Sequence, residues 1–142
     1  MILTVAIVAI ITVAALPSYR NFYIKYSLDA ASDDLQQYLR TAQSLSMASQ
    51  NDDQYGVHLV TGTATTMVVF KGTSYASRDT SFDELSETLA PSLTLSSTVS
   101  GGDVVFTKVE GSTTNTGTVT ITSSEGDVHS VTVNAVGMIQ LD

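Results

Sequence analysis

The residues that could support catalysis or metal binding are few in this sequence, and they are scattered. The two histidines, His58 and His129, each lie in a segment of alternating polar and apolar residues, outside any H-x-x-x-H, H-E-x-x-H or EF-hand spacing. A protein metal site needs three or four converging ligands, so we expect no metal ion at either histidine. The chain has no cysteine, which excludes a disulfide, a thiolate nucleophile and a Cys-ligated metal.

Acidic and hydroxyl side chains give no stronger signal for chemistry. The clusters Asp52-Asp53 and Asp83-Glu84 with Glu87 have the oxygen ligands that calcium prefers, but solvated loop charge is the reading that we favour. The serines lack a G-x-S-x-G motif and a neighbouring base. Gly101-Gly102 is followed by neither a helix nor a lysine, and it therefore predicts a turn without a phosphate. We expect a protein that is not an enzyme and has no cofactor.

Length and charge narrow the classes further. The 142 residues carry 6 basic and 14 acidic side chains, for a formal net charge of -8. This length suits a single globular core of roughly 90 residues with one long helix attached. The negative surface would repel phosphate backbones and anionic lipids, so we expect no nucleic-acid partner.

The chain begins with an apolar run from Met1 to Leu16 that contains no charged residue. As a helix this run rises about 24 Å, somewhat less than the roughly 30 Å hydrocarbon core of a bilayer. It has neither the basic start nor the A-x-A-like end of a signal peptide. Aromatic and basic residues follow Pro17 up to Tyr26 and suit the level of lipid head groups. A signal anchor or a buried core helix is the alternative interpretation of this run alone.

A second helical pattern continues from Ser27 to about Gln50. Its apolar positions recur every three or four residues, while the polar positions between them include Asp33 and Arg40. One helix with an apolar first half and an amphipathic second half needs two environments: apolar surroundings for the first half and a globular head for the second. The residues expected to pack on the head are Leu28, Ala31, Leu35, Tyr38, Ala42 and Leu45.

After Asn51-Asp52-Asp53 the pattern changes to a period near two, which indicates strands. About seven short strands are expected, separated by glycine turns, with a short helix or a loop between Asp79 and Leu89. Regular turns favour antiparallel hairpins. The strand segments begin at Tyr55, Met67, Leu93, Val104, Val119, Val131 and Met138. The fold class is therefore α+β: a long N-terminal helix, its apolar half protruding, packed on a small antiparallel sheet or sandwich.

The run Ala14-Ala15-Leu16-Pro17-Ser18-Tyr19-Arg20-Asn21 resembles the N-terminal helix of type IV pilins and type II secretion pseudopilins. The helix end from Leu39 to Asn51 and the closing segment from Gly117 to Ile139 resemble the H- or T-type minor branch of that family. The family's mature chain starts with an N-methylated Phe, has Glu at its fifth position, and reaches its proline about five residues later than Pro17. A chain that lacks its leader and first mature residues accounts for this offset. The alternative is a true start at Met1, with Val5 at the glutamate position.

The resemblance implies a pilin fold and a structural subunit that polymerises through its N-terminal helix into an extracellular filament. It divides the chain into residues 1–26, the membrane or filament-core half of the helix, residues 27–51, its amphipathic half, and residues 52–142, the β-rich head. It also implies copies of the same chain and an inner-membrane assembly machinery as partners. Before assembly the subunit would lie in the cytoplasmic membrane, in contact with lipid. The core contacts are expected from Met1, Ile2, Leu3, Val5, Ile7, Val8, Ile10, Ile11, Val13 and Leu16.

Pro17 marks the expected break in this helix. It leaves the carbonyl of Val13 without its usual donor, and relatives lose helical form before this proline in the assembled state. We therefore expect an irregular stretch within residues 9–17 of the assembled subunit. Some T-type minor pilins take up DNA through basic residues near the C-terminus, but residues 126–142 contain no Lys or Arg. The other functions considered are a minor pseudopilin of a type II secretion system and a membrane-anchored surface binding module that does not polymerise.

Overall fold

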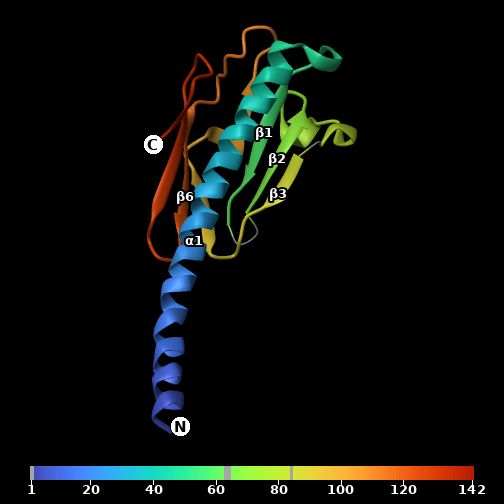
Figure 1. Ribbon diagram of the computed structural model, residues 1–142. Helices are drawn as coiled ribbons and strands as arrows, with labels where there is room; N and C mark the ends of the chain where they lie inside the picture. The colour runs from blue at the N-terminus through green and yellow to red at the C-terminus, as the bar shows by residue number, and fades with distance from the viewer. Residues whose placement is uncertain (1, 63–64, 84) are drawn as a thin grey trace.

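A computed structural model of the chain contains one long helix that runs along a β-rich head and extends beyond it (Figure 1). The structure describes the backbone of residues 2–62, 65–83 and 85–142, and the side chains of residues 20–62, 65–83 and 85–142. The helix, α1, spans Ile2–Met47, which is 46 residues or about 69 Å. Only its second half lies against the head (Figure 1). The fold is α+β, as the sequence predicts.

The backbone of α1 is helical throughout, including residues 9–17. The break expected at Pro17 is therefore not present in this single chain. Proline removes only its own N–H donor, so the hydrogen bonds of the turns on either side of it can keep the helix continuous. The irregular stretch expected in the assembled state remains a prediction.

The helix ends close to the predicted position because three residues beyond it adopt left-handed backbone conformations. Ser49, Asn51 and Asp52 have φ values of 48°, 52° and 57°. Short polar side chains tolerate this region better than most, and it cannot continue a right-handed helix. An irregular turn, Gln50–Asp52, leads from the helix into the first strand.

The head consists of two separate antiparallel sheets of four strands each in the described residues. The first has the order β3-β2-β1-β5, and the second has the order β4-β6-β7-β8. The strands are β1 (Tyr55–Val60), β2 (Thr66–Lys71), β3 (Leu85–Thr88), β4 (Leu93–Ser97), β5 (Asp103–Phe106), β6 (Gly117–Ser123), β7 (Val128–Val133) and β8 (Ile139–Leu141). Consecutive pairs such as β1 with β2 and β6 with β7 are hairpins, as the regular glycine turns indicate.

The segment from Asp79 to Leu89 differs in part from the expectation of a short helix or a loop. A 3₁₀ turn, Thr80–Phe82, is followed by the edge strand β3, which pairs with β2. Leu85 is the one apolar residue of β3 and is only partly buried. Because β3 has no second apolar residue two positions from Leu85, its sequence shows no alternation of apolar and polar residues. The strand was therefore not predicted.

The core lies between the amphipathic half of α1 and the facing sides of both sheets. Leu28, Ala31, Leu35, Tyr38 and Ala42 are buried in it, and Leu45 packs against it while partly exposed. Leu39, which the predicted stripe did not include, is also fully buried. Its burial makes the contact face of α1 wider than one row, because the helix touches both sheets. The largest side chains that fill the sheets' inner faces are Tyr55, Phe106, Met67 and Ile121. Phe70 is buried on the other face of the first sheet, where its ring contacts Tyr75.

Truncation of Leu35 is expected to destabilise the head much more than truncation of Leu45. Leu35→Ala removes a fully buried side chain and leaves a cavity, at a cost of about 2–5 kcal/mol. Leu45→Ala makes the same chemical change on the same helix at a partly exposed site, so we expect a loss of less than about 2 kcal/mol. Chemical denaturation of both variants measures the difference. Equal losses would contradict the packing of α1 described here.

Candidate assembly surface

The side chains that the sequence assigns to a filament core lie outside the described side chains. The backbone of Ile2 to Leu16 belongs to α1, and Met1 lies outside the described residues. The contacts of these residues therefore remain a prediction. In the part of the chain that the structure describes, no helix combines the length and the hydropathy that a membrane span requires.

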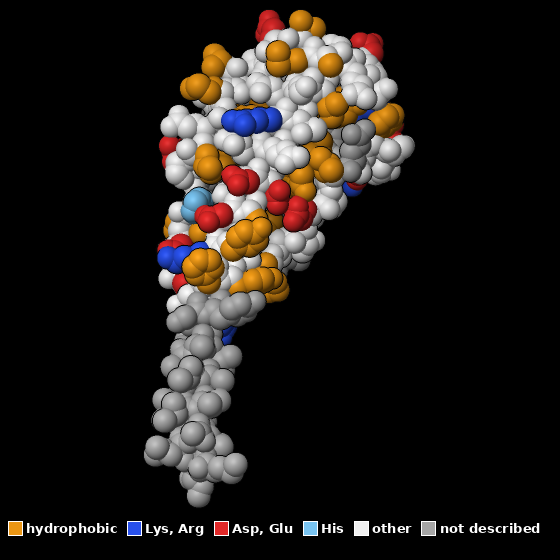
Figure 2. Space-filling view, viewed as in Figure 1, with side chains coloured by type: hydrophobic (Ala, Val, Ile, Leu, Met, Phe, Trp, Pro, Cys, Tyr) orange, Lys and Arg blue, Asp and Glu red, His pale blue; other side chains and the backbone are white. Residues whose placement is uncertain are grey.

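Where α1 leaves the head, aromatic and basic side chains form a surface that we call the neck patch: Arg20, Phe22, Tyr23, Lys25 and Tyr26. Phe22, Tyr23 and Tyr26 are 79%, 60% and 70% exposed. Figure 2 shows hydrophobic side chains at this base of the head. Ile24, between them, is buried and anchors the helix turn to the head. Three neighbouring aromatic side chains that remain exposed on one helix are typical of an interaction surface.

The charges of the neck patch are only partly compensated. Lys25 Nζ lies 3.7 Å from the carboxylate of Asp127, and both side chains are largely exposed, so this ion pair contributes little to stability. Arg20 is exposed and forms no ion pair within the described side chains. The neck patch is thus basic, although the whole chain is strongly acidic.

A groove of about 330 Å³ lies beside the neck, between α1 and the segment from Glu87 to Leu93. The carboxylates of Asp34 and Glu87 both line this groove. Burial, followed by the negative charges of Glu87 and Asp33, raises the pKa of Asp34 above its ordinary value. The Tyr38 hydroxyl donates a hydrogen bond of 2.7 Å to Glu87 Oε2. Burial, this hydrogen bond and the nearby carboxylates raise the pKa of Tyr38 to about 12.

The raised pKa of Tyr38 gives an expected alkaline transition. The unfolded chain releases the phenol proton near pH 10, whereas the folded chain keeps it to about pH 12. Stability linked to this proton is therefore fully present below pH 10 and is lost as the pH rises through the folded value. Tyr38→Phe should remove that pH dependence and lower the free energy of unfolding at pH 7 by about 1 kcal/mol. Thermal melts from pH 7 to pH 12 test this, with the exposed Tyr26→Phe as the control. A Tyr38→Phe variant with an unchanged alkaline transition would contradict the assignment.

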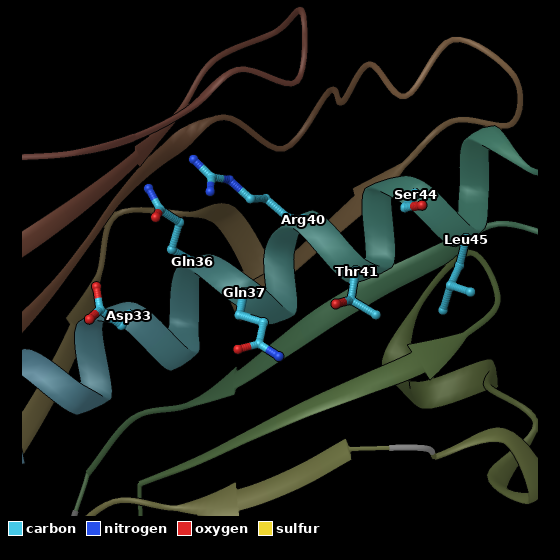
Figure 3. A pocket seen from close by; sticks show the side chains of 7 residues that line it. All are labelled: Asp33, Gln36, Gln37, Arg40, Thr41, Ser44 and Leu45. Carbon is cyan, nitrogen blue, oxygen red and sulfur yellow. The ribbon is translucent and has the colours of Figure 1, made fainter.

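The outward side of α1 bears a shallow polar hollow (Figure 3). In Figure 3, the Gln36 and Arg40 side chains extend to one side of the helix, and Gln37 and Thr41 extend to the other. The lining residues are Asp33, Gln36, Gln37, Arg40, Thr41, Ser44 and Leu45. This set contains hydroxyl groups but no histidine, and its one carboxylate and one guanidinium do not form an ion pair. It offers hydrogen bonds and contact area to a partner.

Both histidines have carboxylate partners that are distant in the sequence. His58 Nδ1 lies 2.5 Å from Asp103 Oδ1, and His129 Nε2 lies 3.3 Å from Asp29 Oδ1. The His58 ring also stacks on Tyr75, with 3.8 Å between the ring centroids. These pairs tie β1 to β5 and β7 to α1. Among the described residues, no group of three or more His, Asp or Glu side chains could hold a metal ion.

Two carboxylates of the acidic clusters considered for calcium accept hydrogen bonds from basic side chains. Asp52 Oδ1 accepts a 3.0 Å hydrogen bond from Lys108, which lowers the pKa of Asp52, and Asp83 Oδ1 accepts one of 3.0 Å from Arg78 Nε. Glu87 accepts the bond from Tyr38, and Glu84 lies outside the described residues. Asp52, Asp83 and Glu87 thus each have a hydrogen-bond partner within the protein.

A second exposed apolar surface lies at the opposite end of the head, and we call it the distal patch: Met47, Val109, Glu110, Val136 and Met138. Val109 is 70%, Val136 74% and Met138 57% exposed. Figure 2 shows hydrophobic side chains at this top end as well. The residues come from the C-terminus of α1, the turn after β5 and the turn before β8. Sequence reasoning missed this patch because its residues lie in three separate segments, and Met47 and Met138 are 91 residues apart.

A single helix side chain holds the two loops of the distal patch together. Gln43 Nε2 donates hydrogen bonds of 2.9 Å to the carbonyl of Gly111 and 2.8 Å to that of Gly137. Val109 has a φ of 67°, which is rare for a β-branched residue, and its N–H donates to the carbonyl of Ser46. The protein therefore holds an exposed valine in an unfavourable backbone conformation, which is a feature more common at functional surfaces than elsewhere.

Comparisons with protein-family models, with curated proteins and with solved structures found no match to this chain.

Proposed function

We propose that this protein is the structural subunit of an extracellular filament of the type IV pilus kind, and that its N-terminal helix is the polymerising element. Its fold is then a pilin fold, with a protruding half-helix and a β head. In this proposal the apolar run from Ile2 to Leu16 packs against the same run of other copies. The subunit is held in the cytoplasmic membrane before assembly, and an inner-membrane machinery adds it to the filament.

One observation carries the proposal. A single continuous helix, Ile2–Met47, has the head packed against its second half, and the backbone of its first half, which is apolar in sequence up to Leu16, extends beyond the head (Figure 1). Uncharged apolar surface of that extent is stable only in lipid or against other protein. Exchange of lipid contacts for helix contacts requires no change in the fold of the head, and close packing provides its driving force.

Electron microscopy of sheared material tests the proposal. Cells that produce the protein should release long thin fibres on shearing, and a protein that contains this sequence should be their repeating component. A membrane-anchored binding module that does not polymerise would remain with the detergent-soluble membrane fraction and release no fibres. The same chain, purified in detergent and then freed of it, should form assemblies. A preparation that stays monomeric without detergent would overturn the proposal.

A further inference from the structure

We infer that the neck patch of one copy docks on the distal patch of a second copy, so that heads stack end to end along the filament. This inference rests on the proposed function and names the contact between heads. The two patches lie at opposite ends of the same head, one where α1 enters it and the other where α1 ends (Figure 1). Tyr26 and Phe22 are 21 and 25 residues from Met47 along a continuous helix. The contact therefore shifts neighbouring copies by about 32 to 38 Å along the helix axis.

The apolar chemistry of the two patches is complementary. The neck patch presents three aromatic rings, whereas the distal patch presents two methionines and two valines without an aromatic residue. Methionine sulfur makes favourable contacts with aromatic rings and adapts its shape to them. Each patch is also exposed enough to lose water on contact, since Phe22 and Val136 are 79% and 74% exposed.

The charges favour the same pairing. Arg20 in the neck patch and Glu110 in the distal patch are both exposed, and neither forms an ion pair within the described side chains. Asp52, next to the distal end of α1, has a side chain that is 97% exposed although Lys108 contacts it. The unpaired Arg20 of the neck patch and the unpaired Glu110 of the distal patch attract each other when copies stack head to tail. Contact between two neck patches, or between two distal patches, would not pair these two charges.

The distal patch is also prepared for docking, because its loops are fixed before contact. The Gln43 amide bonds both loop carbonyls, and the Val109 N–H bonds the end of α1. Little loop ordering remains to oppose association. Because the two surfaces differ, the contact is heterologous and does not close on a pair of molecules. Such a contact can repeat from copy to copy along an open chain of heads, as a filament requires.

Cysteine crosslinking tests the contact directly, because the natural chain has no cysteine. A full-length chain with both Tyr26→Cys and Met138→Cys, assembled into filaments and oxidised, should give a ladder of disulfide-linked multiples on a non-reducing gel. Each single variant should give no more than dimers. The matched control is Gln37→Cys with Met138→Cys, which moves one thiol to the exposed middle of α1, outside both patches. It should give no ladder.

A charge exchange provides the second measurement. Glu110→Arg alone and Arg20→Glu alone should each lower filament yield several-fold, and the double variant should restore most of it. Filaments of normal yield that show no ladder with the Tyr26 and Met138 pair, and no rescue by the exchange, would overturn the inference and leave the filament proposal intact. Absence of filaments from the unmodified chain would overturn both. Circular dichroism of each variant checks that the head remains folded, which the exposed positions lead us to expect.

Discussion

Replacement of Val5 by aspartate is expected to abolish filament assembly while the head stays folded. Val5 belongs to the uncharged run before Pro17, which we propose packs against other copies. A carboxylate transferred into a dry helix bundle costs several kcal/mol in each subunit, and the cost recurs at every position along a filament. Polymerisation multiplies this loss, so fibres should be absent rather than fewer. Electron microscopy of the sheared fraction measures the effect.

The same variant distinguishes the role of the protruding first half of α1, which we call the stem, from that of the head. The core of the head is built from α1 residues after Ile24 and from the strands, so Val5→Asp should leave the melting temperature of the head unchanged. Val5→Leu keeps the site apolar and should assemble normally, and Ile10→Asp should behave like Val5→Asp. Normal fibres from Val5→Asp would show that the stem is not the polymerising element.

Replacement of Gly137 by alanine is expected to lower the free energy of unfolding by about 2–4 kcal/mol. Gly137 has a φ of +79°, and an added Cβ would overlap the carbonyl oxygen of Gly111 and press on the Gln43 amide. The strain of a positive φ at an alanine costs about 1–2 kcal/mol, and the steric overlap of the added Cβ increases the cost further. The clash falls on the junction where Gln43 holds the two loops of the distal patch, so those loops must move apart. Chemical denaturation gives the magnitude.

Gly126 provides a matched control for this clash. It has a φ of +92° in the turn between β6 and β7, and a Cβ there would meet no atom within 4 Å. Gly126→Ala therefore carries the backbone strain alone and should cost about 1–2 kcal/mol. The difference between the two variants isolates the steric contribution at Gly137. Equal losses would show that the Gly111 and Gly137 loops are not in close contact.

Local periodicity made much of this fold predictable. The helical stripe that includes Leu28 and Leu35 recurs at the spacing of one helix face, and its burial against the head was expected. The alternation in Tyr55, Val57 and Leu59 likewise located β1. The edge strand β3 was missed because its contacts are backbone hydrogen bonds to β2, and its sequence carries no matching apolar pattern.

The arrangement of sites was much less predictable, because it depends on contacts between distant segments. His58 and Asp103 are 45 residues apart, and the pairing of β1 with β5 brings them together. The distal patch joins the end of α1 to two turns, and no local signal marks Val136 or Met138 as exposed apolar residues. The neck aromatics were visible in the sequence as residues suited to a membrane surface, but their exposure beside a folded head was not.

The attachment of both sheets to α1 has a mechanical consequence. The two sheets share no strand, and the same helix packs against each of them. A pull on the stem would load these contacts in shear along more than twenty residues of helix, so many side chains would have to slide together before either sheet detached. Forces that peel one strand at a time meet far less resistance. We therefore expect the head to withstand tension along its long axis better than tension across it.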